Sequence, residues 1–256
     1  MSEQLFEIAL DDGELVDIDI DQWGNYVGIT DRQQVLTLSS SFYIYNKIKF
    51  ALVRYLTDIL LLVVSRRTVK GDNAFIYNLE GELLKTFFAG DGVEDVIVVA
   101  DKIIFSYFDE GVFGNPGPNN EGIAIFDFNG QFLYGFNSAN QDMIVDCYAM
   151  CKYDNDKILF YIYPDFPLVE LNINTFKAII YKTSDKFVGA HAMSAYQGQA
   201  LFYGGYNKNQ KFYLWNIWQQ QAILIGEYSG GRIRGIGDGK FISVEKNGFK
   251  IINPLD

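Results

Sequence analysis

The sequence predicts an all-β protein in which six repeated units of four antiparallel strands form a single domain over residues 1–256. Three observations support this prediction. The chain has 21 Phe and 17 Tyr beside only 4 Met and 5 Pro, and aromatic residues combined with Gly, Asn and Asp favour strands joined by tight turns. A short apolar run that ends in a polar residue recurs along the chain. The last unit lacks a strand that the N-terminal segment can supply.

The recurring run marks the third strand of each unit. Each copy ends in an aromatic or aliphatic residue followed by Asn or Asp, as in Phe75-Ile76-Tyr77-Asn78. The closing polar residues are Asn78, Asp127, Asn172, Asn216 and Asn253, with a weaker first copy that ends at Ser39. From first to last they lie 39, 49, 45, 44 and 37 residues apart. A period of about 40 to 50 residues is typical of repeats that each form a four-stranded sheet.

Further strands flank each of these third strands. Asn78 and Asp127 are followed by tight turns that contain Gly81 and Gly130, which is a hairpin signal and predicts a fourth strand. Two strands joined by another turn precede each copy. The first strands are expected to begin near Leu15, Phe50, Val93, Val145, Val188 and Arg232, and the second strands near Tyr26, Ile59, Ile103, Ile158, Leu201 and Phe241.

The two ends of the chain are expected to complete one sheet together. Only three residues follow Asn253, so the sixth unit has no fourth strand of its own, whereas the segment 4–10 is a strand surplus to the first unit. Pairing of the two would leave no long open sheet edge, which favours a closed monomeric ring.

These features resemble the six-bladed β-propeller superfamily over essentially the whole chain. Tyr77-Asn78, Phe126-Asp127 and Trp215-Asn216 stand where WD-repeat proteins have their Trp-Asp pair, and the segment 127–132 is similar to the D-x-x-G-x-h turn of NHL-type propellers. The Gly-His pair of WD repeats is missing, because His191 is the only histidine. The resemblance implies an architecture and no particular functional family. A β-sandwich or a pair of small barrels, the rival folds, would not produce a four-strand period.

Composition and charge exclude several classes of partner. The 32 acidic and 21 basic side chains give a formal charge of −11, which repels nucleic acid and anionic lipid surfaces. The apolar run 59–64 is too short to span a bilayer, and the acidic start of the chain does not resemble an export signal. Cys147 and Cys151 are expected to be free, buried thiols. These features predict a cytoplasmic protein.

Candidate catalytic groups are few. His191, on the first strand of the fifth unit, has no evident nucleophile or acid partner, and we expect it near the central channel. The resemblance to propeller hydrolases and lactonases raises an alternative, a calcium-dependent hydrolase with Asp17 and Asp146 as candidate ligands near the starts of first strands. The preferred prediction has no cofactor and no catalytic residue.

A non-catalytic binding or scaffold function is the preferred prediction, with a protein or a small ligand as partner. In a propeller, the connections between second and third strands and those between blades gather around one end of the channel. The connection 109–122 is by far the longest of these, and a structureless loop of more than about twelve residues is often functional or disordered. Aromatic and Arg side chains are common interface anchors. The candidate binding residues are Arg66, Arg67, Asp109, Phe113, Tyr163, Phe166, His191 and Tyr206.

Overall fold

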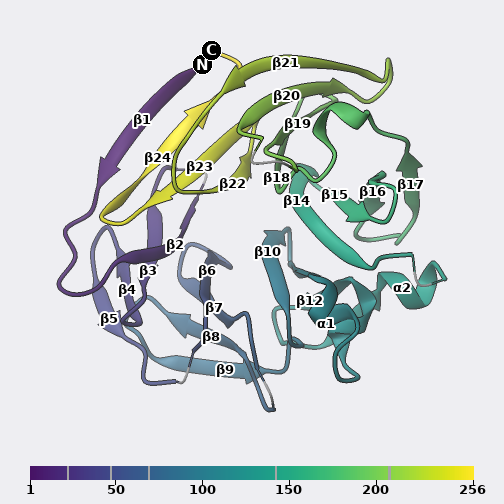
Figure 1. The fold of residues 1–256 in the computed structure, drawn as a ribbon. Helices are drawn as coiled ribbons and strands as arrows, with labels where there is room; N and C mark the ends of the chain where they lie inside the picture. The colour runs from purple at the N-terminus through teal and green to yellow at the C-terminus, as the bar shows by residue number, and fades with distance from the viewer. Residues whose placement is uncertain (22, 47, 69, 142, 207–208) are drawn as a thin grey trace.

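The computed structural model describes residues 1–21, 23–46, 48–68, 70–141, 143–206 and 209–256. Within these ranges, 24 strands form six separate four-stranded antiparallel sheets. The sheets are arranged as blades around a central axis, referred to below as the channel, with the two termini side by side (Figure 1). The predicted all-β fold with six four-stranded blades is confirmed.

Each blade runs from an innermost strand at the channel to an outermost strand at the rim. The strands of blades 1 to 3 are β2 (Leu15–Ile20), β3 (Tyr26–Thr30), β4 (Gln34–Thr37) and β5 (Ser41–Tyr43); β6 (Ala51–Tyr55), β7 (Leu60–Ser65), β8 (Ala74–Asn78) and β9 (Leu83–Phe87); β10 (Val93–Val99), β11 (Lys102–Tyr107), β12 (Ile123–Asp127) and β13 (Phe132–Gly135). Those of blades 4 to 6 are β14 (Asp146–Asp154), β15 (Lys157–Tyr163), β16 (Leu168–Asn172) and β17 (Ala178–Tyr181); β18 (Ala192–Tyr196), β19 (Gln199–Tyr203), β20 (Lys211–Asn216) and β21 (Gln221–Glu227); β22 (Arg232–Gly237), β23 (Lys240–Glu245), β24 (Gly248–Asn253) and β1 (Ser2–Glu7).

The N-terminal strand closes the last blade, as the sequence predicts. β1 pairs with β24 from Ser2↔Asn253 to Glu7↔Gly248, and the rings of Phe6 and Phe249 stack at 4.7 Å. The strand ends earlier than the predicted range 4–10, because the chain leaves the ladder after the Ile8 amide donates to the Asn247 carbonyl. The ring is therefore closed by backbone hydrogen bonds between segments that are far apart in sequence.

Three of the innermost strands begin later than predicted, two of them by one residue and the third by four. β6 begins at Ala51 and β14 at Asp146, each one residue later than expected. β18 begins at Ala192 instead of Val188, because the short helix η2 (Asp185–Phe187) and a turn closed by Ala190 N–H to Phe187 C=O occupy the preceding residues. His191 therefore lies just before the strand on which it was expected.

The core consists of six apolar clusters, one between each pair of neighbouring blades. The sixth cluster joins blade 6 to blade 1 through side chains such as Leu15, Ile18 and Ile242. Each blade thus buries both of its faces against its neighbours, which explains the near-continuous apolar runs in the inner strands.

The cysteines are free and buried, as predicted. Cys147 belongs to the cluster between blades 3 and 4, whereas Cys151 belongs to the cluster between blades 4 and 5. Residues four apart on a regular strand would share a face. A register shift between Cys147 and Ala149 places the two thiols on opposite faces of β14. None of the described helices is long and apolar enough to cross a bilayer.

Candidate functional site

The connections between second and third strands and those between blades meet at one end of the channel, here called the loop face. Arg67, between β7 and β8, forms ion pairs with Asp91, between β9 and β10, and with Glu110, between β11 and β12. These contacts place the connections of blades 2 and 3 side by side. The opposite end, formed by the short hairpin turns, is here called the turn face.

The long connection of blade 3 is ordered and has secondary structure of its own. It contains the short helices α1 (Asp109–Val112) and η1 (Pro118–Glu121). The buried amide of Asn119 donates to the carbonyls of Gly111 at 2.6 Å and Asn115 at 3.0 Å. The amide of Asn120 donates to the Val112 carbonyl at 2.7 Å. The two asparagines thus satisfy carbonyl groups that a structureless loop would leave to water.

This ordered connection presents one aromatic side chain to solvent. Phe113 follows α1 and is 72% exposed, while its neighbour Val112 is buried. The Phe113 amide donates to the Asp109 carbonyl at 2.9 Å. The backbone on both sides of Phe113 is therefore fixed, and the side chain projects from a rigid support.

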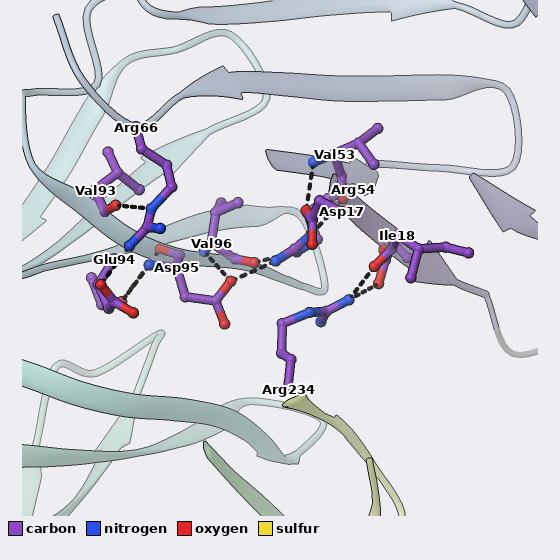
Figure 2. Close-up of polar contacts among 12 residues, drawn as sticks. Asp17, Ile18, Val53, Arg54, Arg66, Val93, Glu94, Asp95, Val96 and Arg234 are labelled. Atoms are coloured by element: carbon purple, nitrogen blue, oxygen red, sulfur yellow. Dashed lines mark hydrogen bonds and ion pairs between the residues drawn. The ribbon is translucent and has the colours of Figure 1, made fainter. Parts of the chain in front are cut away.

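Arg66 and Arg67 lie beside this connection, each held by a carboxylate. Arg66 donates to Glu94 at 2.6 Å and to the Val93 carbonyl at 2.8 Å (Figure 2). The hydrogen bond from Arg67 to Glu110 raises the pKa of the Arg67 guanidinium. Both guanidinium groups also lie over the ring of Phe108, at 5.9 and 5.5 Å from its centroid. Sequence reasoning missed Phe108 and the pairing of Arg66 with Glu94.

The predicted aromatic residues of blades 4 and 5 form a second group. Tyr206 and Tyr148 share a hydrogen bond between their hydroxyl groups at 2.9 Å. The ring of Phe166 packs against Tyr148, Tyr163 and Tyr206, with centroid distances between 5.0 and 5.7 Å. Phe166 is only 7% exposed, so it supports this group from below, whereas Tyr163 and Tyr206 are 42% and 49% exposed. Tyr148 was not predicted from the sequence.

His191 lies at the channel mouth, as expected. It lines a cavity of about 90 Å³ together with Glu94, Tyr148 and Arg232. A side chain at Gly204 would lie 2.1 Å from the imidazole, and this glycine has a positive φ of 83°. Gly204 therefore provides both the space and the backbone conformation that the histidine position requires. Burial lowers the pKa of His191, which favours the neutral imidazole.

Below the mouth, two arginines connect blades across the channel (Figure 2). Arg54 on β6 pairs with Asp17 on β2 and with Asp95 on β10, and its Nε donates to the Val96 carbonyl at 2.6 Å. Arg234 on β22 donates to the Ile18 carbonyl at 2.7 Å and to Asp19 at 3.1 Å. The two arginines thus join blades 1, 2, 3 and 6 through buried charged contacts.

The candidate calcium ligands have different environments. Asp17 accepts hydrogen bonds from Arg54 and from the Val53 amide. Burial opposes its ionisation, but the charges of Arg54 and Arg234 hold the pKa of Asp17 below its usual value. At Asp146, burial and then the charges of Asp109 and Glu94 raise the pKa to about 7. The described residues contain no group of three or more His, Cys, Asp or Glu side chains arranged to hold a metal ion.

The predicted residues therefore fall into two groups on the loop face. Arg66, Arg67 and Asp109 lie around the rigid connection that presents Phe113. Tyr163, Phe166 and Tyr206 form the aromatic group at blades 4 and 5. The cavity with His191 and Tyr148 lies at the channel between them.

Comparison with known proteins identifies an architecture. No protein-family profile and no curated protein matches the sequence. Among solved structures, virginiamycin B lyase from Staphylococcus aureus is similar with a TM-score of 0.59 and 11% identity, over 98% of each chain. The β-propeller domain of Cps50 (Swd1) from Myceliophteria thermophila has a TM-score of 0.59 and 8% identity, over 93% of this chain and 83% of that one. Kluyveromyces lactis Hsv2 has a TM-score of 0.56 and 11% identity, over 96% and 76%.

The fold is that of a six-bladed β-propeller. Sequence identities of 8 to 11% carry the similarity no further than the fold. Propellers support both enzymes and interaction modules, so function has to be inferred from the site itself.

Proposed function

We propose that this propeller is a non-catalytic binding protein that engages a protein partner through its loop face, with Phe113 as the central anchor. The observation that carries the proposal is an aromatic side chain that is 72% exposed on a connection fixed by amide hydrogen bonds from the buried Asn119 and the half-buried Asn120. A large apolar side chain held in one place loses little conformational entropy on binding, which is how interface hot spots gain affinity.

The surroundings of Phe113 support a macromolecular partner. A groove of about 720 Å³ is lined by Arg67 and Asp91, which form an ion pair. Arg67 also pairs with Glu110 of the 109–122 connection, so the groove lies beside this connection. Phe50, which is 72% exposed, lines the same groove. A projecting aromatic residue beside a groove with charged and aromatic walls is typical of a protein interface.

The test compares two exposed aromatic residues on opposite faces. Phe113→Ala removes the anchor on the loop face, and Trp218→Ala removes a side chain that is 74% exposed in the β20–β21 turn on the turn face. Affinity capture with the wild-type protein identifies candidate partners, whose affinities for the three proteins are then measured. We expect Phe113→Ala to weaken binding by about 2 kcal/mol, roughly 30-fold in Kd, and Trp218→Ala to leave it unchanged. Equal affinities of all three proteins would contradict the proposal.

The calcium-dependent hydrolase of lactone or ester type is the competing hypothesis, and a thermal shift experiment separates the two. Asp17 is committed to Arg54 and the Val53 amide, so a calcium ion would have to displace a buried ion pair. We expect the melting temperature to be the same in calcium and in EDTA. A rise with calcium that Asp146→Ala abolishes would favour the hydrolase.

A further inference from the structure

Strand β22 sends two arginines into the channel. Arg232 and Arg234 pair with Val244 and Ile242 in uninterrupted register, so both side chains project from the same face of the strand. Both line the cavity of about 90 Å³ that also contacts Glu94, Tyr148 and His191. This is the cavity at the centre of the loop face.

Arg234 is only partly satisfied by its partners. It is 9% exposed, and its Nη2 donates to the Ile18 carbonyl and to Asp19. Its Nε is buried and has no acceptor among the residues that the structure describes. A buried guanidinium N–H without an acceptor is unfavourable, so Arg234 keeps one donor that a ligand oxygen could satisfy.

Arg232 is also available to donate hydrogen bonds to a ligand. It is exposed at the mouth and makes no hydrogen bond or ion pair within the described part of the chain, whereas Arg54, Arg66 and Arg234 each have a carboxylate partner. Arg232 also lines a neighbouring cavity with Arg66, which places it between the two cavities. A guanidinium at the wall of a cavity is suited to binding a carboxylate.

Three polar side chains around the cavity already have partners. Glu94 accepts from Arg66, Asp95 accepts from Arg54, and the Tyr148 hydroxyl is paired with Tyr206. Unused donors remain at Arg232 and at the Nε of Arg234, and Arg234 lines both this cavity and the adjoining one with Asp19 and Lys152. The volume of about 90 Å³ corresponds to roughly three water molecules at about 30 Å³ each, which is enough for one carboxylate group.

We propose that Arg232 and Arg234 form a carboxylate-binding site at the mouth of the channel. The proposal rests on the proposed function in one respect: in the complex, an Asp or Glu side chain or a C-terminal carboxylate of the protein partner occupies the site. A free small carboxylate would use the same donors.

The first experiment uses acetate as the probe and does not require the partner. The melting temperature of the full chain is measured in sodium acetate and in sodium chloride at equal ionic strength. We expect acetate to raise the melting temperature of the wild-type protein and of Arg32→Gln, which removes an exposed arginine elsewhere. Arg232→Gln should lose the rise, and Arg232→Lys should retain part of it. Equal melting temperatures in the two salts, or a full rise in Arg232→Gln, would overturn the proposal.

A second experiment distinguishes the two sources of the carboxylate once a partner is in hand. Competition by acetate against binding of the wild-type protein, together with at least tenfold weaker binding of Arg232→Gln, assigns the carboxylate to the partner. An acetate-dependent rise in melting temperature without competition assigns the site to a free carboxylate. The failures are also distinct, because loss of the Phe113→Ala effect would leave the acetate response intact, and loss of the acetate response would leave the Phe113→Ala effect intact.

Discussion

Arg54 Nη1 lies 2.5 Å from Asp17 Oδ2, and both side chains are only 2% exposed. The same guanidinium contacts Asp95 and the Val96 carbonyl, so a single side chain of blade 2 joins blades 1 and 3 across the channel. Buried ion pairs contribute little net stability, but removing one partner leaves an uncompensated charge. The pair therefore fixes how three blades are arranged.

We expect Arg54→Met to destabilise the protein by about 3 to 5 kcal/mol, because Asp17 and Asp95 would remain buried without their cation. Lys211→Met, which removes the exposed pair with Glu227 at 3.6 Å, should change the free energy of unfolding by less than about 0.5 kcal/mol. Urea denaturation of both variants provides the comparison. A loss in Arg54→Met as small as that in the control would mean that the pair does not stabilise the arrangement of the blades.

Closure of the ring predicts a strong effect of the N-terminal strand. Deletion of residues 1–10 removes β1 and exposes the edge of β24, so we expect the truncated protein to unfold or to self-associate. Light scattering after size-exclusion chromatography measures the outcome. Phe6→Ala, which removes the stack on Phe249, should lower the melting temperature more than Leu5→Ala, whose side chain is 56% exposed. A truncated protein that remains a stable monomer would contradict the role of β1 in closure.

The environment of Asp146 predicts a pH dependence of stability. Its pKa is about 7 in the folded protein, compared with an ordinary value of 3.8. Between these values the folded protein binds more protons at this site than the unfolded chain. Its contribution to stability is therefore complete below about pH 3.8 and is lost as the pH rises to about 7.

Asp146→Asn cannot ionise at this position, so we expect its stability relative to the wild type to increase between pH 4.5 and pH 8. Urea unfolding at a series of pH values measures the difference between the two proteins. A constant difference over this range would show that the carboxyl of Asp146 has no raised pKa in the folded state.

The rigidity of the Phe113 support predicts a specific change in hydrogen exchange. Asn119 is 1% exposed and bridges the carbonyls of Gly111 and Asn115. Asn119→Ala leaves these carbonyls without their donor, which should cost about 1 to 3 kcal/mol and accelerate exchange in residues 109–122. Asn174→Ala, in the β16–β17 turn, serves as the control and should leave this segment unchanged. Slow exchange of the segment in Asn119→Ala would mean that other contacts hold it.

The architecture could be predicted because its determinants are periodic and local. The polar residues that end the third strands, such as Asn78 and Asp127, and the surplus N-terminal strand are visible without any long-range information. The order of the 109–122 connection could not be predicted. It depends on amide hydrogen bonds from Asn119 and Asn120 to carbonyl groups up to eight residues away. In the sequence, an Asn in a loop indicates a turn and does not show which carbonyl its side chain will contact.

The candidate site could be predicted only in part, because its contacts join residues that are far apart in the sequence. Arg66, Arg67 and Tyr206 were chosen as candidates because of their residue type and their place in expected loops. The partners that decide their environment, Glu94 and Tyr148, lie on or beside the innermost strands of other blades, and no local pattern links them to the loops. Burial of Phe166 likewise follows from packing between blades.

Photo-cross-linking from position 113 tests partner binding through the loop face most directly. Benzoylphenylalanine replaces Phe113 in one protein and Trp218 in another, and both proteins are irradiated with a cell extract. We expect a discrete cross-linked protein from position 113 and none from position 218. Cross-linking to the same protein with equal yield from both positions, or no adduct from position 113, would contradict a binding surface centred on Phe113.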